Sequence, residues 1–180
     1  YGFLASLYED AKDLKTAEKT LLEGLAVAPA SADLHYRLGV IYEKTDRFDE
    51  SMKQMEEVLK IEPDSAEALN FIGYSYADRG IKLQEAEALI KKALELRPGD
   101  GYITDSLGWV YFKQNRIEEA ILYLEEASRI LPDDPAIAEH LGDAYARNGR
   151  IEEAVEKYRL VLRLKPDAEK VRDKIGTLKK

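Results

Sequence analysis

Apolar residues recur along the chain with the spacing of α-helices. Leu38, Ile41 and Tyr42 form one such stripe, and the next comprises Met52, Met55, Val58 and Leu59. Steps of three and four residues place side chains on one face of a helix. Between the stripes lies Asp46-Arg47, which is typical of a turn. The pattern therefore predicts two amphipathic helices joined by a short turn.

The same two-helix pattern repeats along the whole chain. Further turns are predicted at Gly80-Ile81-Lys82, Asn115-Arg116 and Asn148-Gly149-Arg150. Two residue types then share a step of 34 or 35 residues: the prolines Pro29, Pro63, Pro98, Pro132 and Pro166, and the tyrosines Tyr8, Tyr42, Tyr76, Tyr111 and Tyr145. A fixed period in this range indicates stacked structural repeats. Because proline cannot continue a helix, each proline is expected to end a repeat.

Small residues keep the same register inside the predicted helices. One series runs Ala5, Gly39, Gly73, Gly108 and Gly142, and another runs Ala17, Ser51, Ala86, Ala120 and Ala154. Glycine inside a helix costs about 1 kcal/mol relative to alanine. Its recurrence at one position therefore predicts a close approach between the two helices of each repeat. At Asp134-Pro135, an aspartate cap followed by proline is expected to begin a helix.

These residues resemble the signature of the tetratricopeptide repeat. One repeat carries it as Leu107, Gly108, Tyr111, Ala120, Leu124, Ala127 and Pro132, and the next as Leu141, Gly142, Tyr145, Ala154, Tyr158, Val161 and Pro166. The resemblance implies an all-α fold, a right-handed α-solenoid of stacked antiparallel helix hairpins with a C-terminal capping helix. The segment from Asp100 to Trp109 also resembles long repeat proteins of Gram-negative bacteria, some of them envelope lipoproteins.

We expect one array over residues 1–180. Its repeats are predicted at about 1–31, 32–65, 66–100, 101–134 and 135–168, followed by a capping helix at about 169–180. That last segment has an apolar stripe of Val171, Ile175 and Leu178, with Lys179 among the residues of its polar face. The first repeat begins inside its first helix, so further repeats are expected before it.

Composition narrows the classes of function. The chain has 27 Lys and Arg against 35 Asp and Glu, a net charge of -8, which disfavours binding to nucleic acid and to anionic lipid. It contains no cysteine, which excludes disulfides and thiolate metal sites. No apolar run approaches the ~20 residues that span a bilayer, so membrane insertion by this segment is not expected. The compartment stays open, cytoplasmic or, in a bacterial envelope protein, periplasmic.

Candidate chemistry is sparse. The only histidines, His35 and His140, lie three repeats apart and are not expected to share a metal or a base. Adjacent glutamates such as Glu118-Glu119 point about 100° apart on a helix and do not converge like a catalytic pair. Phosphate-binding loops and nucleophile motifs are absent from the sequence. We therefore expect no enzyme activity, no cofactor and no metal.

In the tetratricopeptide family, the first helices of the hairpins line the concave side and contact ligands. The resemblance implies that partner binding involves Tyr36, Val40, Glu43, Asn70, Tyr74, Tyr102, Asp105, Trp109, Phe112, Glu139 and Asp143. The aromatic members are expected to be exposed and to anchor a ligand, Trp109 and Phe112 above all. The alternative, that aromatics pack on neighbouring helices, stays open, most of all for Tyr36 and Tyr74.

The predicted function is a protein-protein interaction scaffold that holds a peptide or helix of a partner in the concave groove. Acidic residues flank the aromatics, namely Asp33, Glu67, Asp105, Glu139 and Asp143. A basic or amphipathic peptide would complement them. The alternative is a structural module that forms homo-oligomers through its open N-terminal repeat, where Tyr1 to Leu4 lie.

Overall fold

The computed structural model of the protein describes residues 1–178. In this range the chain forms eleven α-helices and no strand. They are α1 Gly2–Asp10, α2 Leu14–Val27, α3 Ala32–Lys44, α4 Phe48–Ile61, α5 Ala66–Asp78, α6 Leu83–Leu96, α7 Gly101–Lys113, α8 Ile117–Ile130, α9 Pro135–Arg147, α10 Ile151–Leu164 and α11 Glu169–Leu178. The prediction of an all-α fold of helix pairs is confirmed.

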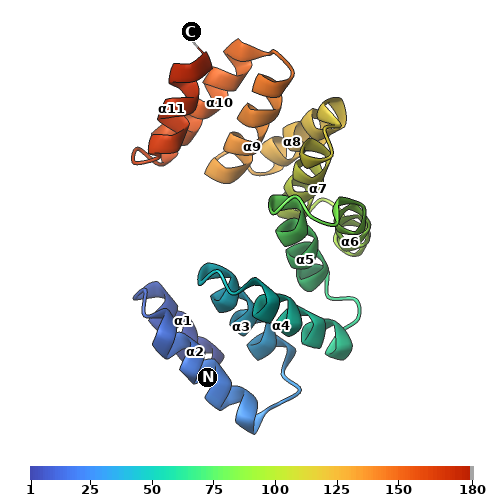
Figure 1. Cartoon of the computed structure of the whole chain (residues 1–180), viewed down its shortest axis with the longest axis vertical. Helices are drawn as coiled ribbons and strands as arrows, with labels where there is room; N and C mark the ends of the chain where they lie inside the picture. The colour runs from blue at the N-terminus through green and yellow to red at the C-terminus, as the bar shows by residue number, and fades with distance from the viewer. Residues whose placement is uncertain (179–180) are drawn as a thin grey trace. The chain divides into compact units, whose positions relative to one another are not determined.

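The helices pack into two compact units, residues 1–72 and residues 73–180, with the division inside α5. In the first unit α1 pairs with α2 and α3 with α4, and the two hairpins lie side by side (Figure 1). Leu21, Leu38 and Ile41 form part of the first unit's buried core, which α1, α2 and α3 share. The second hairpin adds Met55, which is fully buried, from α4.

In the second unit α7 pairs with α8 and α9 with α10, and α11 packs on α10 (Figure 1). The largest fully buried side chains here include Ile90, Leu107, Leu124 and Leu141, one or more from each of α6 to α9. Of the predicted capping stripe, Val171 is buried. Lys179, predicted on its polar face, and Lys180 lie outside the described residues.

The recurring glycines mark close helix contacts, as predicted. A Cβ atom built on Gly39 would lie 2.6 Å from Met55 Cε, and one on Gly108 would lie 2.7 Å from Leu124 Cγ. Such distances are shorter than real side-chain contacts, so a larger residue at either position would force the facing side chain of the second helix to move. The side chain that fills the space always comes from the second helix of the same hairpin.

Turns and caps follow from local chemistry. The hairpin turns contain left-handed residues, with φ of 58° at Asp46, 62° at Asn115 and 78° at Gly149. Asparagine, aspartate and glycine adopt this region more readily than other residues. Asp134 Oδ1 accepts hydrogen bonds from the backbone of Ala136 at 2.8 Å and Ile137 at 3.1 Å, with Pro135 beginning the helix. The predicted cap is confirmed.

An arginine after each of three hairpin turns ties successive hairpins together. Arg116 Nε donates to Glu119 of α8 at 2.7 Å, and its Nη1 donates to Glu87 of α6 at 3.1 Å. Its guanidinium also lies over the ring of Tyr111, 4.2 Å from the centroid. The same arrangement recurs as Tyr42, Arg47, Glu50 and Glu18, and as Tyr145, Arg150, Glu153 and Glu125.

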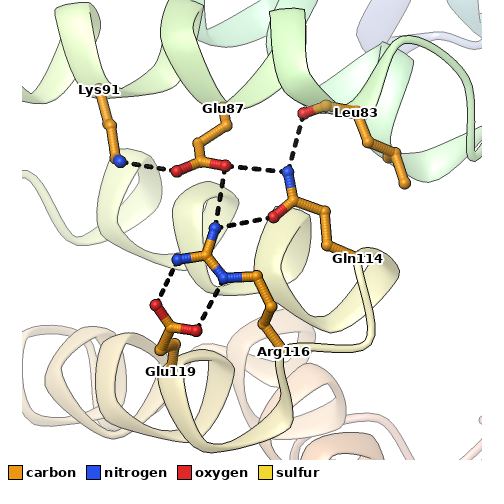
Figure 2. Close-up of polar contacts among 6 residues, drawn as sticks. All are labelled: Leu83, Glu87, Lys91, Gln114, Arg116 and Glu119. Atoms are coloured by element: carbon orange, nitrogen blue, oxygen red, sulfur yellow. Dashed lines mark hydrogen bonds and ion pairs between the residues drawn. The ribbon is translucent and has the colours of Figure 1, made fainter.

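Glu87 is the centre of the most extensive of these networks (Figure 2). It also accepts hydrogen bonds from Lys91 Nζ at 2.6 Å and from Gln114 Nε2 at 2.9 Å. Burial alone would raise the pKa of Glu87, but these two hydrogen bonds and the charges of Lys91 and Arg116 lower it from 4.5 to about 2. Glu87 therefore stays ionised and holds α6 against the turn between α7 and α8.

Candidate functional site

A groove of about 460 Å³ lies in the first unit, at the positions where the sequence predicts ligand contacts. Tyr36 and Val40 of α3 line it together with Val58 of α4. The groove follows α3, and Glu9 of α1 and Glu67 of α5 also line it. Its complete lining is Glu9, Ala32, Asp33, Tyr36, Arg37, Val40, Val58, Glu62, Ser65 and Glu67.

The groove combines an apolar floor with an acidic rim. Four of its lining residues are carboxylates, against a single cation, Arg37. Arg37 Nε donates to both carboxylate oxygens of Asp33, at 2.9 and 3.0 Å. Glu9 forms an ion pair with Lys44, and Glu62 is exposed. A positively charged ligand with an apolar portion fits this chemistry.

Tyr36 belongs both to the groove and to the packing beneath it. Its ring meets the ring of Phe71 edge-on, with centroids 6.0 Å apart. The expected packing on a neighbouring helix is thus present, and contact of Tyr36 with a ligand stays a prediction. Asn70 is half-buried, and its Oδ1 is buried without a hydrogen-bond partner among the described residues. Glu43 is half-buried in α3, outside the groove lining.

The prediction that Trp109 is an exposed aromatic is wrong. Its side chain is 8% exposed, and two rings stack against it. His140 stacks on it with centroids 4.1 Å apart, and Phe112 stacks at 4.9 Å. The Nζ atom of Lys113 lies 5.1 Å from the ring centroid. Trp109 is therefore a packing residue of the second unit, and any contact with a partner stays a prediction.

The other aromatics of the second unit differ in exposure. Phe112 is half-buried at the edge of the stack, and Tyr74 is half-buried with its ring 6.3 Å from His140. Tyr102 is 59% exposed, as the sequence led us to expect. The predicted cluster therefore contains one exposed ring of the second unit and a stack that the fold itself buries.

The predicted acidic residues of the second unit are already bound by cationic or ring groups of the chain. Asp105 is buried and its two carboxylate oxygens lie 3.0 and 2.9 Å from His140 Nδ1. Glu139 accepts a hydrogen bond from Lys174 Nζ at 2.9 Å, and Asp143 accepts from the same atom at 2.6 and 2.8 Å. A partner would have to compete with these contacts.

Lys174 thus links α11 to α9 through Glu139 and Asp143. Burial lowers the pKa of Lys174, but its hydrogen bonds to Asp143 and Glu139 outweigh burial and raise it. Tyr158 donates a hydrogen bond to Asp143 at 2.7 Å, and burial followed by this contact raises the pKa of its hydroxyl above the usual range. A groove of about 520 Å³ lies beside this cluster, lined by Phe112, Asp143, Ala146, Arg147, Tyr158, Lys170, Asp173, Lys174, Thr177 and Leu178.

Sequence reasoning missed the contacts of His140 and Lys174. His140 pairs with Asp105, and Lys174 pairs with Glu139 and Asp143. A signal was present, because Asp105 and His140 stand 35 residues apart, as do Glu139 and Lys174. A separation of one 34-residue period plus one residue places an acidic side chain of one first helix beside a basic side chain of the next. Among residues 1–178 no group of three His, Asp or Glu side chains could hold a metal, and each helix there is too short or too polar to cross a bilayer.

Comparison with known proteins agrees with this architecture. Two family models described as tetratricopeptide repeat match residues 8–73 and residues 106–169, together more than half of the chain. The TPR repeat-containing protein PA4667 of Pseudomonas aeruginosa is 38% identical over 101 residues, 56% of this chain. The chain spans 17% of the length of that relative.

Solved structures share the fold at low sequence identity. The structure of PilF from Pseudomonas aeruginosa has a TM-score of 0.77 at 20% identity, covering 99% of this chain and 86% of that one. The thermophilic TPR protein TTC0263 of Thermus thermophilus has a TM-score of 0.81 at 18% identity, covering 97% and 95%. At these identities the likeness concerns the fold alone.

Proposed function

Because the chain belongs to the tetratricopeptide repeat family, we propose that it is a protein-interaction scaffold whose first unit binds a basic, partly apolar segment of a partner protein. Its fold and its structural neighbours fit such a scaffold. The observation that supports the binding mode is the groove around Tyr36 and Val40, where an apolar floor and four carboxylates meet.

The size and charge of the groove select the ligand. A volume of about 460 Å³ accommodates a few side chains rather than a whole domain. Carboxylates on the rim attract a lysine or arginine, while Val40, Val58 and the face of Tyr36 take its aliphatic stem or an apolar neighbour. The interaction should weaken as salt rises, since rim charges are screened.

Two synthetic peptides test this proposal. One is an amphipathic leucine-lysine helix and the other a leucine-glutamate helix of equal length, each titrated calorimetrically into the chain. We expect the lysine peptide to bind and the glutamate peptide not to bind. Glu62→Lys, at an exposed position of the rim, should weaken the lysine peptide at least tenfold.

Glu56→Lys supplies the matched control, because Glu56 is exposed on α4, the helix that Glu62 directly follows, but does not line the groove. It makes the same change of net charge and should leave the affinity within about twofold. Equal binding of both peptides, or equal losses in the two variants, would show that attraction is non-specific and would overturn the proposal.

One observation favours the alternative function, self-assembly. Helix α1 exposes Phe3 at 78% and Leu7 at 49%, four residues apart and so on one face. A second copy could cover this apolar surface. Sedimentation over a range of concentrations tests it: Phe3→Ser should abolish a concentration-dependent dimer, and a wild-type chain that stays monomeric at high concentration rules this alternative out.

A further inference from the structure

A further groove lies inside the second unit, where the α7–α8 hairpin meets the α9–α10 hairpin (Figure 1). It has a volume of about 370 Å³. Helix α8 and the turn after it, α9 and α10 contribute its lining, which is Glu125, Ser128, Arg129, Pro132, Leu141, Tyr145 and Lys157. None of these residues belongs to α11. Both walls of the groove therefore come from complete hairpins.

The groove coincides with a change of residue type in α8. The twelfth residue of every other second helix is a half-buried leucine, namely Leu25, Leu59, Leu94 and Leu162. In α8 the twelfth residue is Ser128. Serine fills less space than leucine and gives up the apolar contact that leucine would make. The replacement therefore leaves room between the two hairpins at this junction.

A second change of residue type faces the first. The seventh residue of the other second helices is uncharged, namely Thr20, Gln54, Leu89 and Tyr123. In α10 it is Lys157, which is half-buried and donates a hydrogen bond from Nζ to Ser128 Oγ at 3.1 Å. The two departures from the repeat pattern are thus in direct contact, and together they place a hydroxyl and a cation in the groove.

The cations of this groove have no carboxylate partner. Neither Lys157 nor Arg129, which is exposed, forms an ion pair with any carboxylate of residues 1–178. The arginines that follow the hairpin turns behave differently, since Arg116 alone pairs with both Glu87 and Glu119. Two positive charges in the groove are therefore available to a ligand.

The carboxylate that lines the groove is already engaged. Glu125 accepts hydrogen bonds from Tyr145 Oη at 2.7 Å and from Arg150 Nη1 at 3.4 Å. Burial, followed by the contact with Glu125, raises the pKa of the Tyr145 hydroxyl, so this hydroxyl stays a donor. Because Arg150 offsets the charge of Glu125, the groove as a whole favours an anion.

We propose that this groove binds a phosphorylated side chain of a partner protein. A phosphate monoester carries a charge of about -1.5 to -2 at pH 7 and three acceptor oxygens, which suits two cations and a hydroxyl. A carboxylate carries a single charge and would leave one of the two cations unpaired. The groove is also larger than a phosphate group, and Pro132 and Leu141 give it an apolar wall for the residues beside the phosphate.

This site is separate from the groove around Tyr36, with which it shares no lining residue. It adds a contact that depends on phosphorylation of the partner, whereas the groove of the first unit selects a basic segment. The two proposals therefore stand or fall independently.

The probe is a capped, fluorescently labelled peptide, Leu-Ala-Ser-Ala-Leu, phosphorylated on its serine. Fluorescence anisotropy with the intact chain should show binding, and the unphosphorylated peptide should bind at least about tenfold more weakly. Lys157→Gln and Arg129→Gln each remove one cation of the groove. Each substitution should weaken the phosphorylated peptide by about tenfold, as expected for the loss of a charge-assisted contact.

Ser128→Leu separates a binding role from a packing role. It restores the leucine that the other second helices carry, so it should fill the groove and reduce binding at least about tenfold. Thermal unfolding should show a midpoint equal to or above that of the parent chain, because apolar contact is gained.

Arg163→Gln is the matched control for Arg129→Gln. Arg163 is the thirteenth residue of α10, as Arg129 is of α8, and it is exposed but does not line the groove. This variant makes the same change of net charge and should leave the affinity within about twofold.

Four outcomes would overturn the proposal. The phosphorylated peptide might fail to bind at millimolar concentration, or might bind Ser128→Leu as tightly as the parent chain. Equal binding of a peptide with glutamate in place of phosphoserine would show that a single negative charge suffices. Inorganic phosphate that displaces the peptide at a concentration equal to the dissociation constant of the peptide would assign the groove to the free ion.

Discussion

Trp109→Ala should destabilise the second unit strongly. The side chain is 8% exposed and stacks with the rings of His140 and Phe112, at centroid distances of 4.1 and 4.9 Å. Truncating a buried tryptophan to alanine costs about 3–5 kcal/mol, because apolar contacts are lost and a cavity remains. Each stacked aromatic pair contributes about 0.5–1.5 kcal/mol to such a loss. We therefore expect the free energy of unfolding to fall by about 4 kcal/mol.

Tyr102→Ala is the matched control, since Tyr102 lies on the same helix but is 59% exposed. An exposed substitution of this kind changes stability by about 0.5 kcal/mol or less. Urea denaturation followed by circular dichroism compares the two variants with the parent chain. Trp109 is the only tryptophan, so its fluorescence also reports the unfolding of the second unit in the parent.

The result that would refute this reasoning is specific. If Trp109→Ala loses less than about 1 kcal/mol while Tyr102→Ala behaves as expected, the three-ring stack does not stabilise the unit. Loss of partner binding at unchanged stability would then restore the interpretation of Trp109 as a ligand anchor, which the burial of its ring contradicts.

Two further substitutions test the packing and the charges. Glu87→Gln should remove on the order of 2 kcal/mol at pH 7, because the pKa of Glu87 is depressed from 4.5 to about 2. That stabilisation is complete above pH 4.5 and is lost as the pH falls toward 2, so urea curves of the parent and the variant should converge there. If the gap is the same at pH 3 and pH 7, the network is not electrostatic. Gly176→Ala should raise the free energy of unfolding by roughly 0.5–1 kcal/mol, because alanine has the higher helix propensity and nothing among residues 1–178 packs within 4 Å of the new methyl group. Gly142→Ala should lower it, because the new methyl group meets Tyr158 at 2.6 Å. Thermal unfolding that ranks the two variants in the reverse order would contradict the packing described.

The fold could be predicted from the sequence because its determinants are local or strictly periodic. Proline ends each repeat, a left-handed residue such as Asn115 turns the chain, and glycine marks where a second helix approaches. Each of these signals acts within one hairpin. Because these signals recur about every 34 residues, the whole chain predicts the fold more strongly than the pattern of any single helix does.

The candidate site was harder to predict because it depends on contacts between hairpins. Tyr36 and Val40 line a groove, and their contact with a partner stays a prediction. Trp109 occupies the same register as Val40 in a later repeat, yet His140 from the next first helix covers its ring. Burial at one register position thus varies with the identity of a side chain 31 residues away. The alternation of acid and base on successive first helices is a signal that could reveal such pairs in other sequences.

The arginines that contact two successive hairpins limit where the protein can be divided into modules. Arg116 follows the turn of one hairpin but completes the carboxylate network of the hairpin before it, through Glu87. A block excised from proline to proline would therefore separate Arg116 from Glu87, which would keep Lys91 of its own helix but lose the guanidinium. Modules meant for shuffling should instead run from one second helix through the following turn, so that donor and acceptor travel together.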